Sequence, residues 1–146
     1  MKGIIATLGV ALICTPAIAR QGAAGAYDWR PSLSVEVDLD RSGQMDSARL
    51  GTAADSVGLL ITVNSKPLPL IEIPIDGSKQ FGICPGSDPR ISLSAQSEAP
   101  LNALGETPQG YEICPDCIEI VIDGGECDSL HFYWDTTGGK LAWWRT

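Results

Sequence analysis

Short runs in which apolar and polar residues alternate recur along this chain. In SLSVEVDL, residues 32–39, every second side chain is apolar, and this period of two is typical of a strand with one buried face. Clusters of glycine, proline, serine and asparagine separate the runs and mark turns. Six further runs predict strands: VGLLITVN (57–64), LIEIPI (70–75), RISLSAQ (90–96), CIEIVID (117–123), LHFYWD (130–135) and KLAWW (140–144).

Helical periodicity is weak throughout. The stretch that could hold a turn of helix is MDSARLGTAADS, residues 45–56. Residues 85–110 contain four of the ten prolines and few large apolar residues, so we expect a long excursion with a single strand, tied at its ends by cysteines. The pattern predicts an all-β fold: a small disulfide-bonded sandwich or partly closed barrel of about 7–8 short strands.

The first residues have the composition of a secretory signal peptide. MKGIIATLGVALICTPAIA carries one lysine, an apolar run and two small residues, Ala17 and Ala19, and this predicts cleavage after Ala19. Residues 20–31 are mostly small and glycine-rich, so we expect a flexible leader followed by a single β domain over residues 32–146. We therefore expect a periplasmic or secreted protein, with no membrane insertion after signal cleavage.

The predicted mature chain is acidic. Cleavage removes Lys2 from the ten basic residues and none of the eighteen acidic ones, which leaves a net charge of −9. These charges are spread along the chain rather than gathered in a block. Nucleic acid and anionic membrane surfaces are therefore poor partners for this protein.

Four cysteines follow the predicted cleavage site: Cys84, Cys114, Cys117 and Cys127. An even number in an exported chain indicates two disulfides. Three pairings are possible, and the sequence does not choose among them. We favour Cys84 bonded to one cysteine of the CPDC segment and Cys127 bonded to the other, because each bridge then closes a loop long enough to restrict the unfolded chain.

The segment DLDRSGQMD, residues 38–46, has the spacing of a calcium loop. A hard cation takes about six to eight oxygen ligands, and alternate residues of a tight loop can point inward to supply them. Gly43, at the sixth position, provides the backbone freedom that the turn needs. Met45 would then turn back toward the core. The candidate ligands are the side chains of Asp38, Asp40, Ser42 and Asp46 and the backbone carbonyl of Gln44.

This segment resembles the calcium loops of FG-GAP repeats, with the pattern D-x-D-x-[DNS]-G-x-x-D, which are known from integrin-type propellers and from secreted bacterial proteins with isolated copies. The resemblance covers nine residues and the flanking strands, and it implies a structural Ca²⁺ bound by the same five residues. The helix-loop-helix version of the loop does not fit, because its twelfth position is Arg49. Three carboxylates without that twelfth ligand imply a dissociation constant of roughly 10⁻⁴–10⁻³ M. The alternative is a polar turn held by Asx-type hydrogen bonds.

Two other chemistries can be drawn from the cysteines. CPDC has the spacing of a redox pair, but a strand-like run follows it, where a thioredoxin-type site needs a helix. Zinc could use Cys114, Cys117, Cys127 and His131, although an oxidising compartment favours disulfides. His131 is the only histidine, and its place in LHFYWD predicts a half-exposed strand residue. No GxSxG turn is present that would expose a serine nucleophile.

The C-terminal stretch, residues 130–146, concentrates three of the four tryptophans around TTGG. This pattern predicts a hairpin whose turn uses glycine at positive φ. Phe132, Trp134, Leu141 and Trp143 would supply the core. Tyr133 or Trp144, on the opposite parity, could instead form a surface that binds sugar rings or a protein partner.

These features together favour an exported, non-catalytic binding or structural protein of the cell envelope, stabilised by a Ca²⁺ loop. Its partner could be an envelope protein or a cell-wall enzyme. The competing hypothesis is a secreted hydrolase or thiol-redox enzyme that acts on envelope material. Reactive thiols or a catalytic metal would distinguish the second class from the first.

Overall fold

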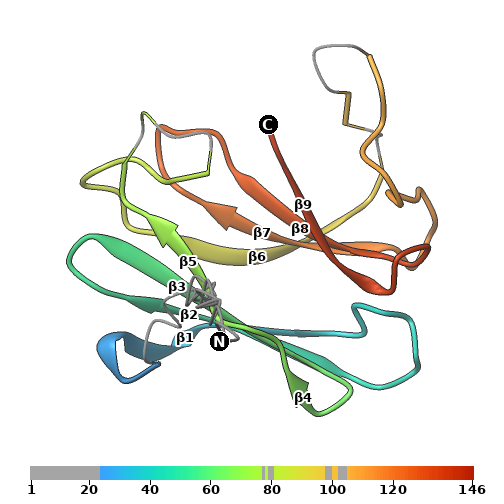
Figure 1. Cartoon of the computed structure of the whole chain (residues 1–146), viewed down its shortest axis with the longest axis horizontal. Coiled ribbons are helices and arrows are strands. Elements are labelled where there is room, and N and C mark those ends of the chain that lie inside the picture. Colours follow the sequence, from blue (N-terminus) through green and yellow to red (C-terminus); the bar gives the residue numbers. More distant parts are fainter. Residues whose placement is uncertain (1–23, 77, 79–80, 98–99, 102–104) are drawn as a thin grey trace, which may run out of the picture.

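The computed structural model describes residues 24–146, apart from 77, 79–80, 98–99 and 102–104. The predicted signal peptide and residues 20–23 of the predicted leader lie outside the described residues. The described chain is all-β, as predicted, and its nine strands form two antiparallel sheets that lie one above the other (Figure 1). Both sheets are open, so the arrangement is a sandwich rather than a barrel. In the described part of the chain, no helix is long and apolar enough to cross a membrane.

The first sheet is built around one long central strand. Strand β3 pairs with β2 along one edge, and β2 pairs in turn with β1. The other edge of β3 is shared by two short strands, with β5 beside its first half and β4 beside its end. The strands are β1 (Asp28–Val37), β2 (Asp46–Thr52), β3 (Ser56–Val63), β4 (Lys66–Pro67) and β5 (Ile71–Pro74).

The second sheet is a simple meander in which each strand pairs with the next. Within its described residues, the long excursion after Cys84 contains one strand, β6, as predicted. The TTGG segment forms the predicted hairpin, with Asp135 paired to Lys140 and Gly139 at a φ of 59°. The strands are β6 (Arg90–Ala95), β7 (Ile118–Asp123), β8 (Leu130–Asp135) and β9 (Lys140–Arg145).

The core lies between the two sheets and is made of aliphatic side chains from both. Burying these groups removes apolar surface from water, at about 25 cal/mol per Å², and this is the main force that holds the layers together. The fully buried residues include Leu50, Leu59, Ile61, Ile73, Ile120, Ile122, Leu130 and Phe132.

Strand β2 replaces the turn of helix expected within residues 45–56. Its side chains alternate in exposure, with Ala48 and Leu50 buried and Arg49 exposed between them. Both edges of β2 are paired, to β1 and to β3, so its backbone groups are satisfied by its neighbours. This pairing with distant residues outweighs the weak local preference of the segment.

The first strand begins earlier than the sequence predicts. We expected a flexible leader through residue 31, but β1 starts at Asp28 and Tyr27 is only 8% exposed. The Tyr27 ring packs over Gly58, where an added Cβ would lie 3.1 Å from it. Its hydroxyl donates a hydrogen bond to Glu72 at 3.0 Å. Because Gly58 has no side chain, the Tyr27 ring fits against the sheet at this position, and this contact orders this part of the predicted leader.

Candidate metal centre

The acidic loop connects two strands that pair antiparallel, β1 and β2. Strand β1 ends at Val37 and β2 begins at Asp46, so residues 38–45 connect a strand to its hairpin partner, and Asp46 is the first residue of that partner. The turn uses left-handed backbone at Gly43, with a φ of 84°, and at Arg41, with a φ of 59°. Glycine adopts this conformation without steric penalty, which explains why it occupies the sixth position.

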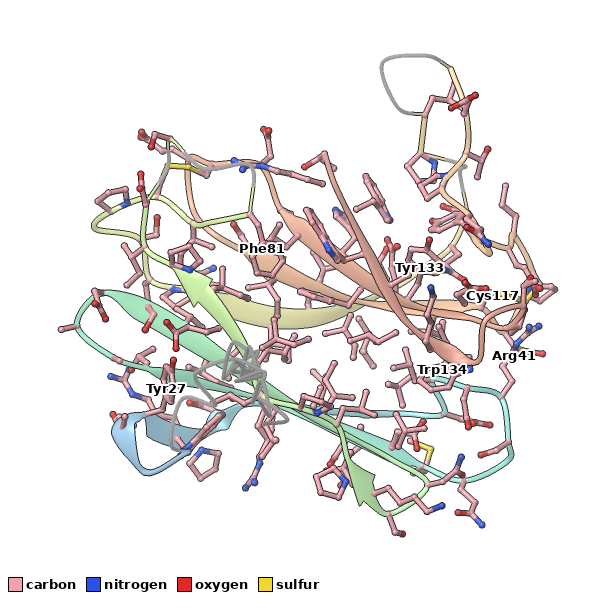
Figure 2. The ribbon with its side chains drawn as sticks, in the orientation of Figure 1. Tyr27, Arg41, Phe81, Cys117, Tyr133 and Trp134 are labelled. Atoms are coloured by element: carbon pink, nitrogen blue, oxygen red, sulfur yellow. A yellow bond between two sulfur atoms is a disulfide. The ribbon has the colours of Figure 1, made fainter. Side chains whose placement is uncertain are left out.

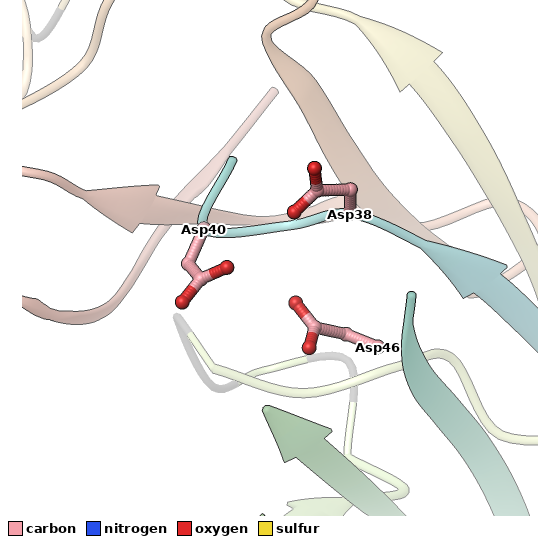
Figure 3. A group of neighbouring side chains, drawn as sticks. All are labelled: Asp38, Asp40 and Asp46. Carbon is pink, nitrogen blue, oxygen red and sulfur yellow. The ribbon is translucent and has the colours of Figure 1, made fainter. Parts of the chain in front are cut away.

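Three carboxylates converge inside the loop. Each of Asp38, Asp40 and Asp46 offers an oxygen, and these oxygens all lie within 4.8 Å of one another (Figure 3). Calcium binds oxygen at about 2.3–2.6 Å, so two ligands of one ion lie at most about 4.6–5.2 Å apart. The spacing and the all-oxygen donor set therefore fit a calcium ion.

The carboxylates also organise the loop through backbone hydrogen bonds. Asp46 is 3% exposed and accepts hydrogen bonds from two backbone amides, that of Leu39 at 3.0 Å and that of Asn64 at 2.9 Å. Asp38 accepts from the amides of Ser42 and Gly43, both at 2.9 Å. Each carboxylate oxygen has two lone pairs, so these bonds leave acceptor sites for a cation.

Asn64 is the residue at this site that sequence reasoning missed. It lies in the two-residue β3–β4 hairpin, where it and Ser65 have φ values of 49° and 63°. Its Nδ2 donates to Asp40 at 2.5 Å, and its Oδ1 accepts from the Ser42 hydroxyl at 2.8 Å. The VNSK pattern indicates a hairpin turn, but only the pairing of β2 with β3 brings that turn to the acidic loop.

The pKa of Asp40 lies below its ordinary value. Burial raises this pKa, but hydrogen bonds from Ser42 and Asn64 lower it by more. The ionised carboxylate is therefore favoured, which is the form that binds a hard cation.

The other residues in and near the loop do not all lie where the sequence predicts. Gln44 is exposed, and Met45 is 65% exposed, so the expected turn of Met45 toward the core is wrong; Leu39, 4% exposed, enters the core instead. Arg49, at the twelfth position, lies on β2 with its guanidinium 5.8 Å from the Trp29 ring, and it supplies no acid to the loop. Arg41 turns away from the carboxylates to pair with Glu112 at 2.6 Å.

Comparison with protein-family models, with curated proteins and with solved structures gives no match to this chain. The function proposed below therefore depends on the geometry of the chain itself.

The four cysteines that follow the predicted cleavage site are all in disulfides, but not in the pairing that we favoured. Cys84 bonds to Cys127, and Cys114 bonds to Cys117 within CPDC. The first bridge ties the segment before β6 to the β7–β8 loop. The turn after Cys114, with the Cys117 amide donating to the Cys114 carbonyl at 3.2 Å, brings the two neighbouring sulfurs together. These disulfides fit an oxidising compartment, and they leave none of the thiolates that the zinc alternative needs.

The CPDC disulfide lies next to the candidate metal loop. Arg41 Nη1 lies 3.5 Å from Cys114 Sγ, and Figure 2 shows Arg41 and Cys117 at the same end of the sandwich. Cys117 is 4% exposed, whereas Cys114 is half-buried. The loop and the CPDC segment also line a common hollow, whose walls include Asp38, Gly43 and Asp116.

Tyr133 is not available as a binding surface. It is 2% exposed, its hydroxyl donates to the Gln109 carbonyl at 2.7 Å, and its ring packs edge-on against Tyr111 at 5.1 Å. The segment before β7 folds over this outer face of the second sheet. The alternation along β8 placed Tyr133 on the outer face, but it could not show that another segment covers that face. By contrast Trp143, expected in the core, is 41% exposed.

Trp144 belongs to a network around a buried carboxylate. Its ring stacks on His131 at 3.9 Å, and its Nε1 donates to Glu119 at 3.1 Å. His131 Nδ1 lies 2.8 Å from the other Glu119 oxygen. Tyr111 also lies near Glu119. The pKa of Tyr111 is raised to about 12, mainly by burial and to a smaller extent by the charge of Glu119. His131 is thus held by its neighbours on the outer face of the sheet, and Trp144 supports a network rather than forming an open platform.

Proposed function

We propose that this chain is an exported, non-catalytic binding or structural protein of the cell envelope, in which a structural Ca²⁺ stiffens the loop between β1 and β2. Asp38, Asp40 and Asp46 would hold the ion, with the Ser42 hydroxyl and the Gln44 carbonyl as further ligands. The observation that carries the proposal is the convergence of three carboxylate oxygens within 4.8 Å. The partner would be an envelope protein or a cell-wall enzyme.

Three further features support this proposal. The loop keeps the strand-loop-strand setting that the FG-GAP resemblance implies. The neighbouring cation, Arg41, is engaged by Glu112 and leaves the carboxylates available. The two disulfides suit a periplasmic or secreted location. Mass spectrometry of the mature protein tests this location and the disulfides, because the mass should correspond to cleavage after Ala19 and to the loss of four cysteine hydrogens.

Calcium should stabilise the mature protein against unfolding. Binding to the folded state alone raises stability by RT ln(1 + [Ca²⁺]/Kd), which is about 2.7 kcal/mol at a hundred times Kd. For a domain of this size we expect the melting temperature to rise by roughly 5–10 °C between chelator and saturating calcium. Differential scanning calorimetry measures the shift.

Variants separate a metal site from a polar turn. Asp38→Asn and Asp40→Asn each remove one carboxylate charge and should abolish most of the calcium shift, whereas Ser42→Asp adds a charged ligand and should enlarge it. Asp88→Asn, at an exposed position outside the loop, is the matched control and should leave the shift unchanged. Equal melting temperatures in chelator and in millimolar calcium would show that the segment is only a hydrogen-bonded turn.

The thiol-redox alternative is favoured by one contact, that of Arg41 with the half-buried Cys114. A guanidinium beside this sulfur would stabilise its thiolate after reduction. The Cys114 thiolate would then attack a substrate disulfide, and the Cys117 thiolate would displace the mixed disulfide, leaving the protein oxidised and the substrate reduced by two electrons. Reduction of insulin disulfides by the protein in the presence of a dithiol, lost in Cys114→Ser, would favour this alternative over a binding role.

A further inference from the structure

The open side of the sandwich holds an apolar cavity of about 470 Å³. Its walls come from both layers, since Ile71 lies on β5 of the first sheet, whereas Phe132 and Trp134 lie on β8 of the second. The segment after β4, Phe81 and residues 139–143 at the end of the hairpin turn and along β9 complete it. Its volume is in the range of small-molecule sites, roughly 300–1,000 Å³. The lining residues are Leu68, Pro69, Ile71, Phe81, Phe132, Trp134, Gly139, Lys140, Leu141, Ala142 and Trp143.

Aromatic side chains form one wall of this cavity. The Phe81 ring meets Trp143 edge-on at 4.7 Å and Phe132 at 6.3 Å, and Phe81 and Trp134 are labelled in Figure 2. Phe132 is buried in the core, but Trp143 remains 41% exposed. Apolar surface at the wall is therefore left in contact with water, and covering it would be favourable.

Lys140 is the single charged residue among those that line the cavity. It is exposed at the start of β9, and it makes none of the ion pairs found among the described residues. Asp135 is its partner in register, but that residue is 1% exposed, and its carboxylate accepts a hydrogen bond from the Gly138 backbone amide at 2.9 Å. In a chain with a net charge of −8, the cavity thus carries an unpaired cation at its wall.

We propose that this cavity binds a free medium-chain carboxylate of the octanoate-to-dodecanoate class. The hydrocarbon chain would lie along the apolar wall between β5 and β9, and the carboxylate would pair with the Lys140 ammonium. An anionic amphiphile matches both features of the site, the apolar lining and the single positive charge, whereas a neutral chain matches only the first. This site is separate from the acidic loop, which supplies none of its lining residues.

A chain-length series tests the apolar part of the proposal. Mature protein, freed of lipid and titrated with octanoate, decanoate and dodecanoate below their micelle concentrations, should bind each by calorimetry and change its tryptophan fluorescence. Each further buried methylene should tighten binding about fourfold until the cavity is full. Leu68→Trp should fill the cavity and weaken binding at least tenfold, whereas Leu68→Met, similar in volume to leucine, should retain it.

The head group is tested by comparing decanoate with decanol. The wild type should prefer decanoate about three- to fivefold, as expected for an exposed ion pair. Lys140→Gln should abolish the preference and leave decanol binding unchanged, whereas Lys66→Gln, a lysine outside the cavity, should keep it. The proposal would be overturned if decanoate bound equally to the wild type and to Leu68→Trp, or if it did not bind at all. A dimer that Leu68→Trp disrupts, without decanoate binding, would assign the cavity to a second copy of the chain and would also overturn it.

Discussion

Replacing Cys84 and Cys127 together by alanine should lower the free energy of unfolding by about 4 kcal/mol. The two cysteines are 43 residues apart, so their bridge removes a large share of the entropy of the unfolded chain. Cys114 and Cys117 are only 3 residues apart, and the same relation gives about 2 kcal/mol for their loss. Urea denaturation of the two double variants and the wild type measures both values.

The comparison between the two bridges is the demanding part of this prediction. Both variants lose two cysteines, so any general effect of removing sulfur is shared, and the difference reports loop length. A larger loss for the Cys114→Ala, Cys117→Ala variant would contradict the entropic account. It would show that the CPDC bridge stabilises the native state through its contacts, which include the one with Arg41.

Glu119→Ala should be the most damaging single substitution on the outer face of the second sheet, with a loss of roughly 3–5 kcal/mol. The side chain of Glu119 is 4% exposed and is the acceptor for Trp144 Nε1 and the partner of His131 Nδ1. Its removal leaves two polar groups without a partner in a site that excludes water. An orphaned buried group costs about 1–3 kcal/mol, and the cavity left by the shortened side chain adds to this.

Two matched variants define the cause of that loss. Glu119→Gln keeps an acceptor of the same shape and should cost less than Glu119→Ala, whereas Glu36→Ala, at an exposed position of β1, should stay within about 0.5 kcal/mol of the wild type. Urea denaturation gives the free energies, and near-ultraviolet circular dichroism reports the packing of Trp144 on His131. If Glu119→Ala unfolds at the same urea concentration as Glu36→Ala, the network does not stabilise the sheet.

Several features of the fold and of the site were predictable from local patterns in the sequence. Alternation of apolar and polar residues predicted β1, β3 and the five strands from β5 to β9. A strand's side chains alternate between two environments, and this leaves a local signature. The β8–β9 hairpin and the convergence of Asp38 and Asp40 are also local, because the residues involved are close in sequence and the glycines allow the turn.

Contacts between distant residues decided the rest. Strand β2 has a weak pattern and is ordered by pairing on both edges, and Tyr27 is ordered by packing over Gly58. Cys84 bonds to Cys127, 43 residues away. Asn64 reaches the acidic loop at Asp46, 18 residues away, and at Asp40, 24 residues away. Buried Tyr133 bonds to Gln109, which is also 24 residues away. Neither the composition nor the alternation of apolar and polar residues predicts which segments contact one another. The sequence by itself therefore determined seven of the nine described strands, the β8–β9 turn and the acidic loop. The packing of the two sheets decided the rest and decided which of these elements meet, because those contacts arise from burial across the whole domain.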